Sequence, residues 1–157
     1  MQLFAGLHER TIDSKNRIQL PSELRDAMEV PHGVGAVYVT LGEDRGTLAV
    51  YTVDGFETLA RRMETEYMAE PESRRFELQF YGLAHRVDVD KQGRLVLPER
   101  LRRMARLNKE VYLIGIKHRI EVWDRAMLEQ AMEIDWTGGR WPEGWPKYTR
   151  MRPRETS

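Results

Sequence analysis

The fold is decided by the segment His8-Glu-Arg-Thr-Ile-Asp13-Ser-Lys-Asn-Arg17-Ile-Gln-Leu20-Pro21-Ser-Glu-Leu24-Arg25, which recurs as His85-Arg-Val-Asp-Val-Asp90-Lys-Gln-Gly-Arg94-Leu-Val-Leu97-Pro98-Glu-Arg-Leu101-Arg102. The two segments align without gaps at an offset of 77 residues, and seven of their eighteen positions are identical. The shared residues are a histidine, an Asp-x-x-x-Arg motif, a Leu-Pro pair and a Leu-Arg pair. A repeat of this kind indicates one structural unit that is present twice.

Each copy predicts two short strands joined by a tight turn. The strands are expected at 7–12 and 17–20 in the first copy and at 83–89 and 94–97 in the second. Asp13 and Asp90 favour the first turn position, because an aspartate side chain can bond to the backbone further along the turn. Asn16 and Gly93 occupy equivalent places and are the residue types that best tolerate a left-handed backbone.

A helix is expected after each of these strand pairs. Pro21 and Pro98 suit a helix start, because proline presets φ and needs no N–H there. The helices are predicted over about 22–29 and 99–106. A second strand pair follows in each copy, over Ala36–Leu41 and Thr47–Thr52, and over Val111–Ile116 and Arg119–Trp123 with a shorter connection. Asp54 and Asp124 are the predicted caps of the helices after these pairs.

The domain organisation follows from the repeat. We predict an α+β chain of duplicated β-β-α-β-β-α units. Residues 1–77 form the first half, with a linking helix at about 72–81, and residues 78–135 form the second half. From Trp136 the sequence has no periodicity, so residues 136–157 are interpreted as a tail containing tryptophan and proline.

The composition is that of a globular protein, with 41% apolar and 32% charged residues and no cysteine for disulfides or thiolate metal sites. No apolar run approaches the roughly 20 residues that cross a bilayer, and no secretory signal is recognisable, so a cytoplasmic location without membrane contact is expected. The formal net charge is zero, whereas nucleic-acid binders are usually basic. However, Ala84 to Arg106 contains seven basic and three acidic residues, which is compatible with a local phosphate-facing surface.

The candidate DNA-contacting residues lie in and beside the two turns, and they are Arg17, Arg94, Lys15, Lys91, Arg10 and Arg86. Paired cationic loops can address phosphates, and arginine can read a guanine edge through two hydrogen bonds. A single Asp-x-x-x-Arg motif is more typical of turn geometry alone, but its duplication favours the binding interpretation. For the helix arginines we favour a solvated face over phosphate contact; these are Arg25, Arg100, Arg102, Arg103 and Arg106.

Other chemistries receive less support. The histidines have no carboxylate or second histidine at metal-ligand spacing, so a packing or capping role is favoured for His8, His32, His85 and His118. Gly33-Val34-Gly35 lacks the context of a phosphate-binding glycine loop and predicts a turn. No catalytic constellation is recognised, and neither an enzyme, nor a metal or other cofactor, nor a small-molecule substrate is expected. The tail tryptophans either pack on their own chain or form a partner surface; they are Trp136, Trp141 and Trp145.

At these residues the sequence resembles the MraZ family of bacterial regulators, which have an AbrB-like, double-psi or swapped-hairpin barrel. The resemblance covers roughly residues 1–135. It rests on Asp13-Ser-Lys-Asn-Arg17 with Leu20-Pro21, on Asp90-Lys-Gln-Gly-Arg94 with Leu97-Pro98, and on Lys109-Glu-Val-Tyr-Leu-Ile-Gly115 with Glu121-Val-Trp-Asp124. It implies that both copies build one intramolecular barrel with peripheral helices. It also implies DNA binding through Arg17 and Arg94, a homo-oligomeric ring, and repeated DNA sites upstream of the division and cell-wall gene cluster.

Two functions remain open. The first is a sequence-specific transcription regulator that binds double-stranded DNA as a homo-oligomer and associates with the nucleoid. The second is an antitoxin-like protein-interaction module of the AbrB type, which the zero net charge and the tryptophan-rich tail favour. Of the two turns, the second is expected to bind DNA more tightly, because it lies in the more basic stretch and has Gly93 where the first has Asn16.

Overall fold

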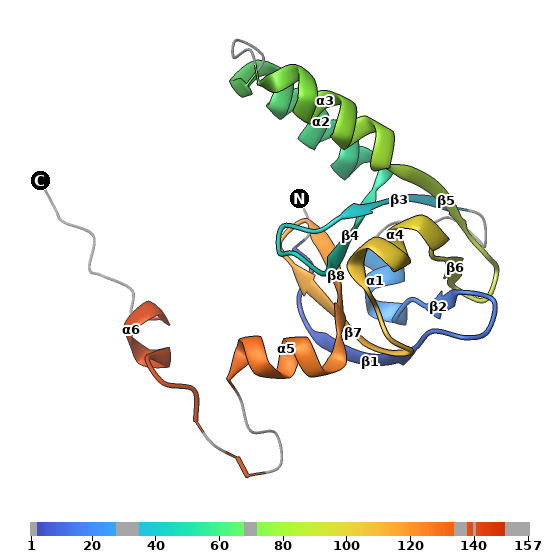
Figure 1. Ribbon diagram of the computed structural model, residues 1–157. Coiled ribbons are helices and arrows are strands. Elements are labelled where there is room, and N and C mark those ends of the chain that lie inside the picture. The colour runs from blue at the N-terminus through green and yellow to red at the C-terminus, as the bar shows by residue number, and fades with distance from the viewer. Residues whose placement is uncertain (1–2, 28–34, 68–71, 134–137, 140, 150–157) are drawn as a thin grey trace, which may run out of the picture. The chain divides into compact units, whose positions relative to one another are not determined.

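The computed structural model describes residues 3–27, 35–67, 72–133, 138–139 and 141–149 of the 157-residue chain (Figure 1). The chain divides into two compact units, Met1–Arg125 and Ala126–Ser157. Within the described ranges, no helix is both long enough and apolar enough to cross a membrane.

The order of the elements follows the repeat, with one helix between the copies. The first copy contains β1 (Leu7–Thr11), β2 (Arg17–Gln19), α1 (Ser22–Ala27), β3 (Gly35–Leu41), β4 (Thr47–Thr52) and α2 (Val53–Tyr67). The linking helix is α3 (Ser73–Leu83). The second copy contains β5 (His85–Val89), β6 (Arg94–Val96), α4 (Glu99–Ala105), β7 (Glu110–Ile116), β8 (Arg119–Asp124) and α5 (Arg125–Met132), and α6 (Trp145–Thr149) follows. The predicted β-β-α-β-β-α order is confirmed.

The named strands belong to one eight-stranded antiparallel sheet, in the order β1-β7-β8-β4-β3-β5-β6-β2. The first hairpins are exchanged between the copies: β1 pairs with β7, β5 pairs with β3, and β2 pairs with β6. The two ends of this order, β1 and β2, are joined by a short turn, so the sheet curls into a nearly closed barrel (Figure 1). The single intramolecular swapped-hairpin barrel that the resemblance implied is therefore confirmed.

The strand register gives the two copies an approximate twofold relation. Leu48 lies opposite Val122 and Val50 opposite Ile120 in the ladder between β4 and β8, and exchanging the copies converts one pair into the other. At the centre of the β2–β6 ladder the equivalent residues Ile18 and Leu95 lie opposite each other. Equivalent residues of the copies therefore occupy equivalent places in the barrel.

The barrel interior is filled by equivalent residues of both copies, because alternate side chains along each strand face the core. Seven such pairs have side chains that are 2% exposed or less: Ile12 and Val89, Ile18 and Leu95, Leu20 and Leu97, Val37 and Val111, Val39 and Leu113, Leu48 and Ile120, and Val50 and Val122. Burial of a side chain of this size contributes about 1.5–3 kcal/mol. Because each copy supplies half of this core, neither copy has a complete hydrophobic core of its own.

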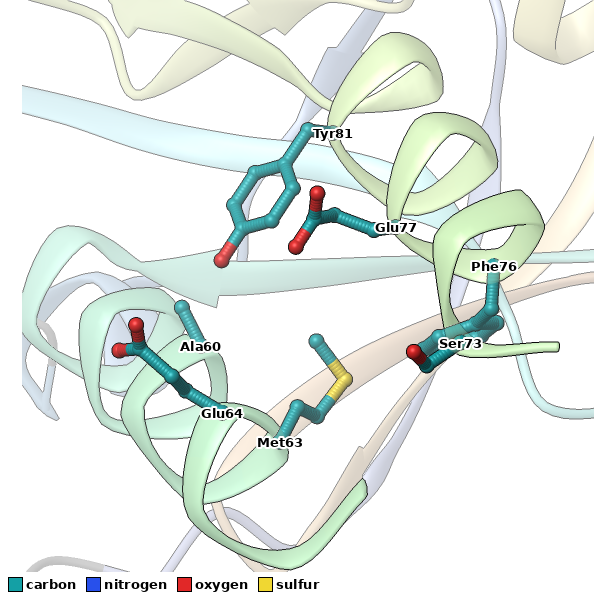
Figure 2. A pocket seen from close by; sticks show the side chains of 7 residues that line it. All are labelled: Ala60, Met63, Glu64, Ser73, Phe76, Glu77 and Tyr81. Carbon is teal, nitrogen blue, oxygen red and sulfur yellow. The ribbon is translucent and has the colours of Figure 1, made fainter. Parts of the chain in front are cut away.

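The helices α2 and α3 form a pair beside the outer face of β3 (Figure 1). Tyr38 of β3 stacks on Phe56 of α2 with ring centroids 4.2 Å apart, and Phe56 stacks on Phe80 of α3 at 5.2 Å. A small cavity lies between the two helices (Figure 2), lined by Ala60, Met63, Glu64, Ser73, Phe76, Glu77 and Tyr81. The helix α3 also leaves large apolar side chains about half exposed, namely Phe76, Leu78 and Tyr81.

Most predicted element boundaries lie within one or two residues of the observed ones, and two of the differences concern the helices α2 and α3. The helix α2 begins before Asp54, because the Thr52 hydroxyl oxygen accepts the Gly55 N–H (2.9 Å) and serves as its cap. The helix α3 continues to Leu83, so β5 begins at His85 rather than at residue 83. Several predictions fall outside the described residues: the last turn of the helix expected to residue 29, His32, the start of the turn at Gly33-Val34, and Trp136.

Gly115 of β7 generates a test of the packing between the barrel and the segment before β1. A Cβ atom at this position would lie 2.6 Å from the backbone nitrogen of Ala5, and the Gly115 N–H donates to the Gly6 carbonyl (2.9 Å). Because the obstacle is backbone, it cannot move aside as a flexible side chain does. We expect Gly115→Ala to lower the free energy of unfolding by about 1–3 kcal/mol, measured by urea denaturation.

The matched control is Gly82→Ala in α3, where an added Cβ meets no atom within 4 Å. Alanine has the higher helix propensity, so this variant is expected to be as stable as the parent chain or slightly more stable. Equal stability of both variants would show that the close approach at Gly115 is not a constraint.

Candidate functional site

The first turn is organised by the carboxylate of Asp13. Its Oδ1 accepts the backbone N–H groups of Lys15 (2.9 Å) and Arg17 (2.8 Å), and its Oδ2 accepts the Nε–H of Arg17 (2.7 Å). The Asn16 N–H donates to the Asp13 carbonyl (3.0 Å), and Asn16 has a φ of 60°, the left-handed region expected at this position. One carboxylate thus fixes both the turn backbone and the direction of the Arg17 side chain.

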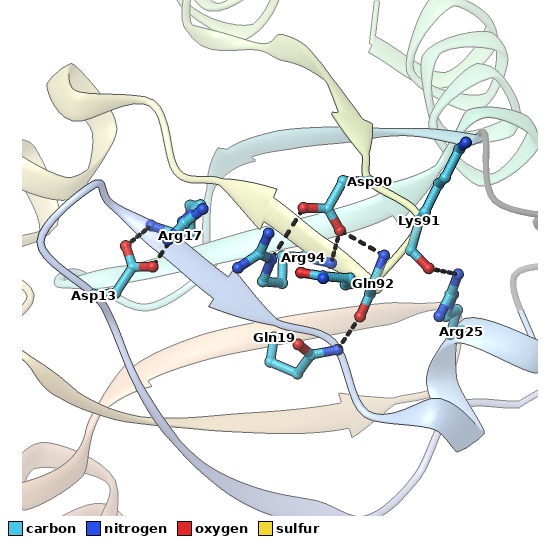
Figure 3. A network of polar contacts seen from close by, with 8 residues as sticks. All are labelled: Asp13, Arg17, Gln19, Arg25, Asp90, Lys91, Gln92 and Arg94. Carbon is cyan, nitrogen blue, oxygen red and sulfur yellow. Dashed lines mark hydrogen bonds and ion pairs between the residues drawn. The ribbon is translucent and has the colours of Figure 1, made fainter.

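The second turn repeats this arrangement around Asp90 (Figure 3). Its Oδ1 accepts the N–H groups of Gln92 (2.9 Å) and Arg94 (2.9 Å), and its Oδ2 accepts the Nε–H of Arg94 (3.0 Å). Gly93 has a φ of 78° and donates its N–H to the Asp90 carbonyl (2.9 Å). The sequence repeat is therefore a repeat of hydrogen bonds.

Both aspartates are held in the ionised form. The backbone N–H of the arginine four residues later is the largest influence lowering the pKa of Asp13 and of Asp90, and the guanidinium adds to it. Each ion pair uses only Nε, and the side chains of Arg17 and Arg94 remain 30% exposed. Among the residues that the structure describes, no Nη atom of either arginine takes part in a hydrogen bond. Each guanidinium therefore keeps a pair of donors for a ligand.

The two arginines lie on the outer face of the β2–β6 ladder. The central residue of each of these strands faces the core, so the flanking residues face outward. Arg17 lies opposite Val96, and Gln19 lies opposite Arg94. The arginines are consequently diagonal neighbours, about 7–8 Å apart at Cα. We call this outward surface of Arg17, Gln19, Arg94 and Val96 the β2–β6 ribbon; Val96 is 51% exposed on it.

Each turn is also held by the other copy of the repeat. Arg25 of α1 donates through Nη2 to the Lys91 carbonyl (3.0 Å; Figure 3). In the opposite direction, Arg102 of α4 donates through Nη1 to Oδ1 of Asn16. The solvated helix face predicted for these two arginines is therefore wrong, because each reaches across to a turn that lies far away in the sequence.

The remaining predicted cations are placed differently from one another. Lys15 and Lys91 are exposed in the two turns, and Arg86 is exposed on β5. Arg10 ties β1 to β2 instead, because its Nε donates to the Gln19 carbonyl (3.0 Å). Three further arginines are exposed in and just after α4, namely Arg100, Arg103 and the C-cap residue Arg106.

The histidines that the structure describes are His8, His85 and His118. His8 and His85 occupy equivalent positions on β1 and β5, and the Nε2 atom of each is buried without a hydrogen-bond partner in the described part of the chain. Within the same residues no three His, Cys, Asp or Glu side chains are grouped so that they could hold a metal ion.

Gln19 and Val96 are parts of this surface that the sequence did not indicate. They are equivalent in the repeat but differ chemically, so the alignment gave no reason to select them. One feature of the sequence could have indicated the contacts that Arg25 and Arg102 make to the opposite copy. These two residues are equivalent in the repeat and are both arginine.

An eight-stranded barrel of exchanged hairpins with two Asp-x-x-x-Arg turns defines the AbrB-like class, here with both halves in one chain. Residues 80–135 match the family described as "MraZ protein, putative antitoxin-like". The chain is 31% identical over 131 residues to a protein of Shewanella denitrificans named transcriptional regulator MraZ, which covers 83% of this chain and 86% of the relative. It is 34% identical over 128 residues to the protein of that name from Acetivibrio thermocellus, and this match covers 81% of this chain and 85% of the relative. The chain belongs to the MraZ family of transcriptional regulators.

The lowered pKa values predict how the turns respond to acid. A carboxyl group whose pKa is lower in the folded than in the unfolded chain stabilises the fold above its ordinary pKa, and this contribution is lost as the pH falls through the lowered value. We therefore expect Asp13 and Asp90 to titrate below their ordinary value of 3.8, measured by NMR. The amide signals of both turns should stay constant from neutral pH down to that range.

Asp13→Asn and Asp90→Asn provide the matching variants at neutral pH. An asparagine oxygen can still accept backbone N–H groups, but its amide then places a donor against the arginine Nε–H. The Nε–H signal of Arg17 or Arg94 should lose its shifted position in the corresponding variant. Glu99→Gln, which removes an exposed carboxylate paired with Arg103, is the control and should leave both signals unchanged. Titration of either aspartate at or above 3.8 would contradict the turn geometry.

Proposed function

We propose that the chain is a sequence-specific regulator that binds double-stranded DNA through the β2–β6 ribbon and its two turns. The observation that carries the proposal is the pair of arginines, Arg17 and Arg94, on one outward face, each oriented by its own carboxylate. The names of the two relatives, transcriptional regulator MraZ, support the regulatory role.

The two-stranded form of the ribbon and its side chains support DNA binding. The major groove of B-DNA admits a two-stranded β-ribbon, and a guanidinium can bond to O6 and N7 of guanine or to two phosphate oxygens. The exposed Val96 offers an apolar group that suits a thymine methyl. Lys15 and Lys91 supply flexible positive charges for phosphates at either side.

The zero net charge is consistent with this proposal, because what matters for DNA binding is where the charges lie on the surface. Each Asp–Arg pair of the turns is neutral in sum, so the long-range attraction for DNA must come from other cations. The lysines of the turns and two exposed arginines in and just after α4 supply it, namely Lys15, Lys91, Arg100 and Arg106. The binding is therefore expected to depend on a modest number of phosphate contacts.

The resemblance to the family extends the proposal to the setting of the protein. The DNA sites are repeated elements upstream of the division and cell-wall gene cluster, and the protein acts in the cytoplasm, associated with the nucleoid. It acts as a homo-oligomeric ring, to which the half-exposed apolar side chains of α3 contribute a contact surface. Neighbouring ribbons then meet DNA sites about one helical turn apart, roughly 34–36 Å.

A band-shift titration with the protein's own upstream DNA tests the proposal. We expect a shift that weakens as salt rises, because counterions are released from phosphates on binding. Arg17→Ala and Arg94→Ala should each cost about 1–3 kcal/mol of binding free energy, the usual value of a bidentate base contact.

Arg45→Ala is the control for this titration, because Arg45 is an exposed arginine in the turn between β3 and β4, outside both the ribbon and α3. Its loss should leave the affinity nearly unchanged. No shift by the parent chain, or equal binding by the variant that lacks both Arg17 and Arg94, would rule out the proposed function.

The second candidate function is a protein-interaction module. Trp141 and Trp145, in the unit Ala126–Ser157, are 71% and 54% exposed, and tryptophan is enriched in the energetic centres of protein interfaces. The family description also includes the term antitoxin-like.

Deletion of residues 136–157 separates the two candidates. Under the DNA-binding proposal the truncated chain should bind the upstream DNA within about twofold of the full chain, because the ribbon lies within the other unit. A co-purifying protein that is lost on deletion, together with a full chain that shifts no DNA, would favour the interaction module instead.

A further inference from the structure

We propose that Arg25 and Arg102 are positioning residues that brace the turn of the opposite copy, so that Arg17 and Arg94 are presented as one rigid pair. The consequence for DNA binding rests on the proposed function, whereas the brace itself does not.

The second turn is held through its backbone. Arg25 Nη2 donates to the Lys91 carbonyl (3.0 Å), and Gln19 Nε2 donates to the Gln92 carbonyl (2.5 Å; Figure 3). A Cβ atom on Gly93 would lie 3.0 Å from Arg25 Nη1 and 3.0 Å from Gln19 Nε2. Glycine therefore suits this position in two ways, through its φ of 78° and through the space that it leaves for the two bracing side chains.

The first turn is held through a side chain. Arg102 Nη1 donates to Oδ1 of Asn16, whose backbone has a φ of 60°. Asn16 stands where the second copy has Gly93, and its side-chain amide supplies an acceptor that glycine lacks. The two braces are equivalent in position but use different acceptors, a backbone carbonyl in one turn and a side-chain amide in the other.

Backbone bonds complete the interlock between the copies. The Leu20 N–H donates to the Gly93 carbonyl (2.8 Å), and the Leu97 N–H donates to the Asn16 carbonyl (2.8 Å). Together with the β2–β6 ladder, these bonds connect the last residue of each turn to the strand end of the other copy. Neither turn can shift by itself without breaking contacts to the opposite copy.

Such bracing affects the affinity of a protein that binds DNA through two arginines. A bidentate contact requires both the distance and the plane of the guanidinium to be correct, and ordering a long side chain on binding costs free energy. A pair whose turns are already fixed loses less conformational freedom when it binds. Arg25 and Arg102 need not touch DNA to have this effect.

The test is a double-mutant cycle on the first turn, with Arg102→Ala, Asn16→Gly and the combined variant. Asn16→Gly retains the turn, because glycine adopts the left-handed backbone without strain, and removes the acceptor while adding backbone freedom. The combined variant separates the two effects, because only the loss of the acceptor is shared with Arg102→Ala. Arg103→Ala is the control, since Arg103 lies on the same helix and pairs with Glu99. Thermal unfolding is recorded for each variant, and Asn16→Gly carries the test if Arg102→Ala does not fold.

The first readout needs no DNA. NMR relaxation of the Lys15 and Arg17 amides should show increased mobility in Arg102→Ala and in Asn16→Gly, with no change at Lys91 and none in the control. Unchanged mobility in both variants would overturn the brace, whether or not the protein binds DNA.

The second readout is affinity for the upstream DNA as a function of salt. Each single variant should bind about tenfold more weakly, and the combined variant no more weakly than either. The salt dependence should stay as in the parent chain, whereas a direct phosphate contact by Arg102 would reduce its slope by about one. Additive losses or a reduced slope would overturn the positioning role. If the parent chain shifts no DNA but the first turn loses order as expected, the brace is supported and the proposed function fails.

Discussion

The pairing of β2 with β6 is the constraint on which both the barrel and the candidate site depend. On its inner side this ladder places Ile18 against Leu95 in the core, and on its outer side it places Arg17 beside Arg94. Because the two strands come from different copies of the repeat, the arginine pair exists only when both copies share one barrel. Folding and binding chemistry are therefore coupled at this ladder: a slip of either strand by one residue would turn that strand's arginine inward and its core residue outward.

The carboxylates of Asp13 and Asp90 position each arginine within its own turn, whereas the ladder positions the two arginines relative to each other. Each accepts three hydrogen bonds from residues within the next four positions, which is nearly the full capacity of a carboxylate. A free arginine side chain would lose much rotational freedom on binding a base edge. Anchoring the guanidinium at Nε removes part of that loss in advance and leaves the two Nη groups available. The ion pair thus organises the ligand-binding group without occupying it.

The sequence was informative wherever the controlling interaction is local. The turns, the prolines at the helix starts and the order of elements follow from residues within a few positions of one another, and these predictions agree with the structure. The exchange of hairpins came from the family resemblance, because periodicity does not identify a pairing partner 77 residues away. The neighbours Gln19 and Val96 and the crossing of Arg25 and Arg102 depend on register and on side-chain reach between copies, neither of which a repeat alignment contains. The cap at Thr52 was missed because threonine at a strand end is also a good strand residue.

The two turns have the same backbone conformation but are braced by different contacts. This difference bears on the prediction that the second turn binds DNA more tightly. Carbonyl oxygens of Lys91 and Gln92 are fixed by the turn itself, so the groups that brace the second turn meet acceptors with no rotational freedom of their own. The first turn depends on the Asn16 amide, which must itself be ordered before Arg102 can hold it. Asn16 also adopts a backbone conformation that favours glycine. From both effects we expect the second turn to be the better ordered of the two before any ligand arrives, which gives the prediction a physical reason beyond the surplus of basic residues around it.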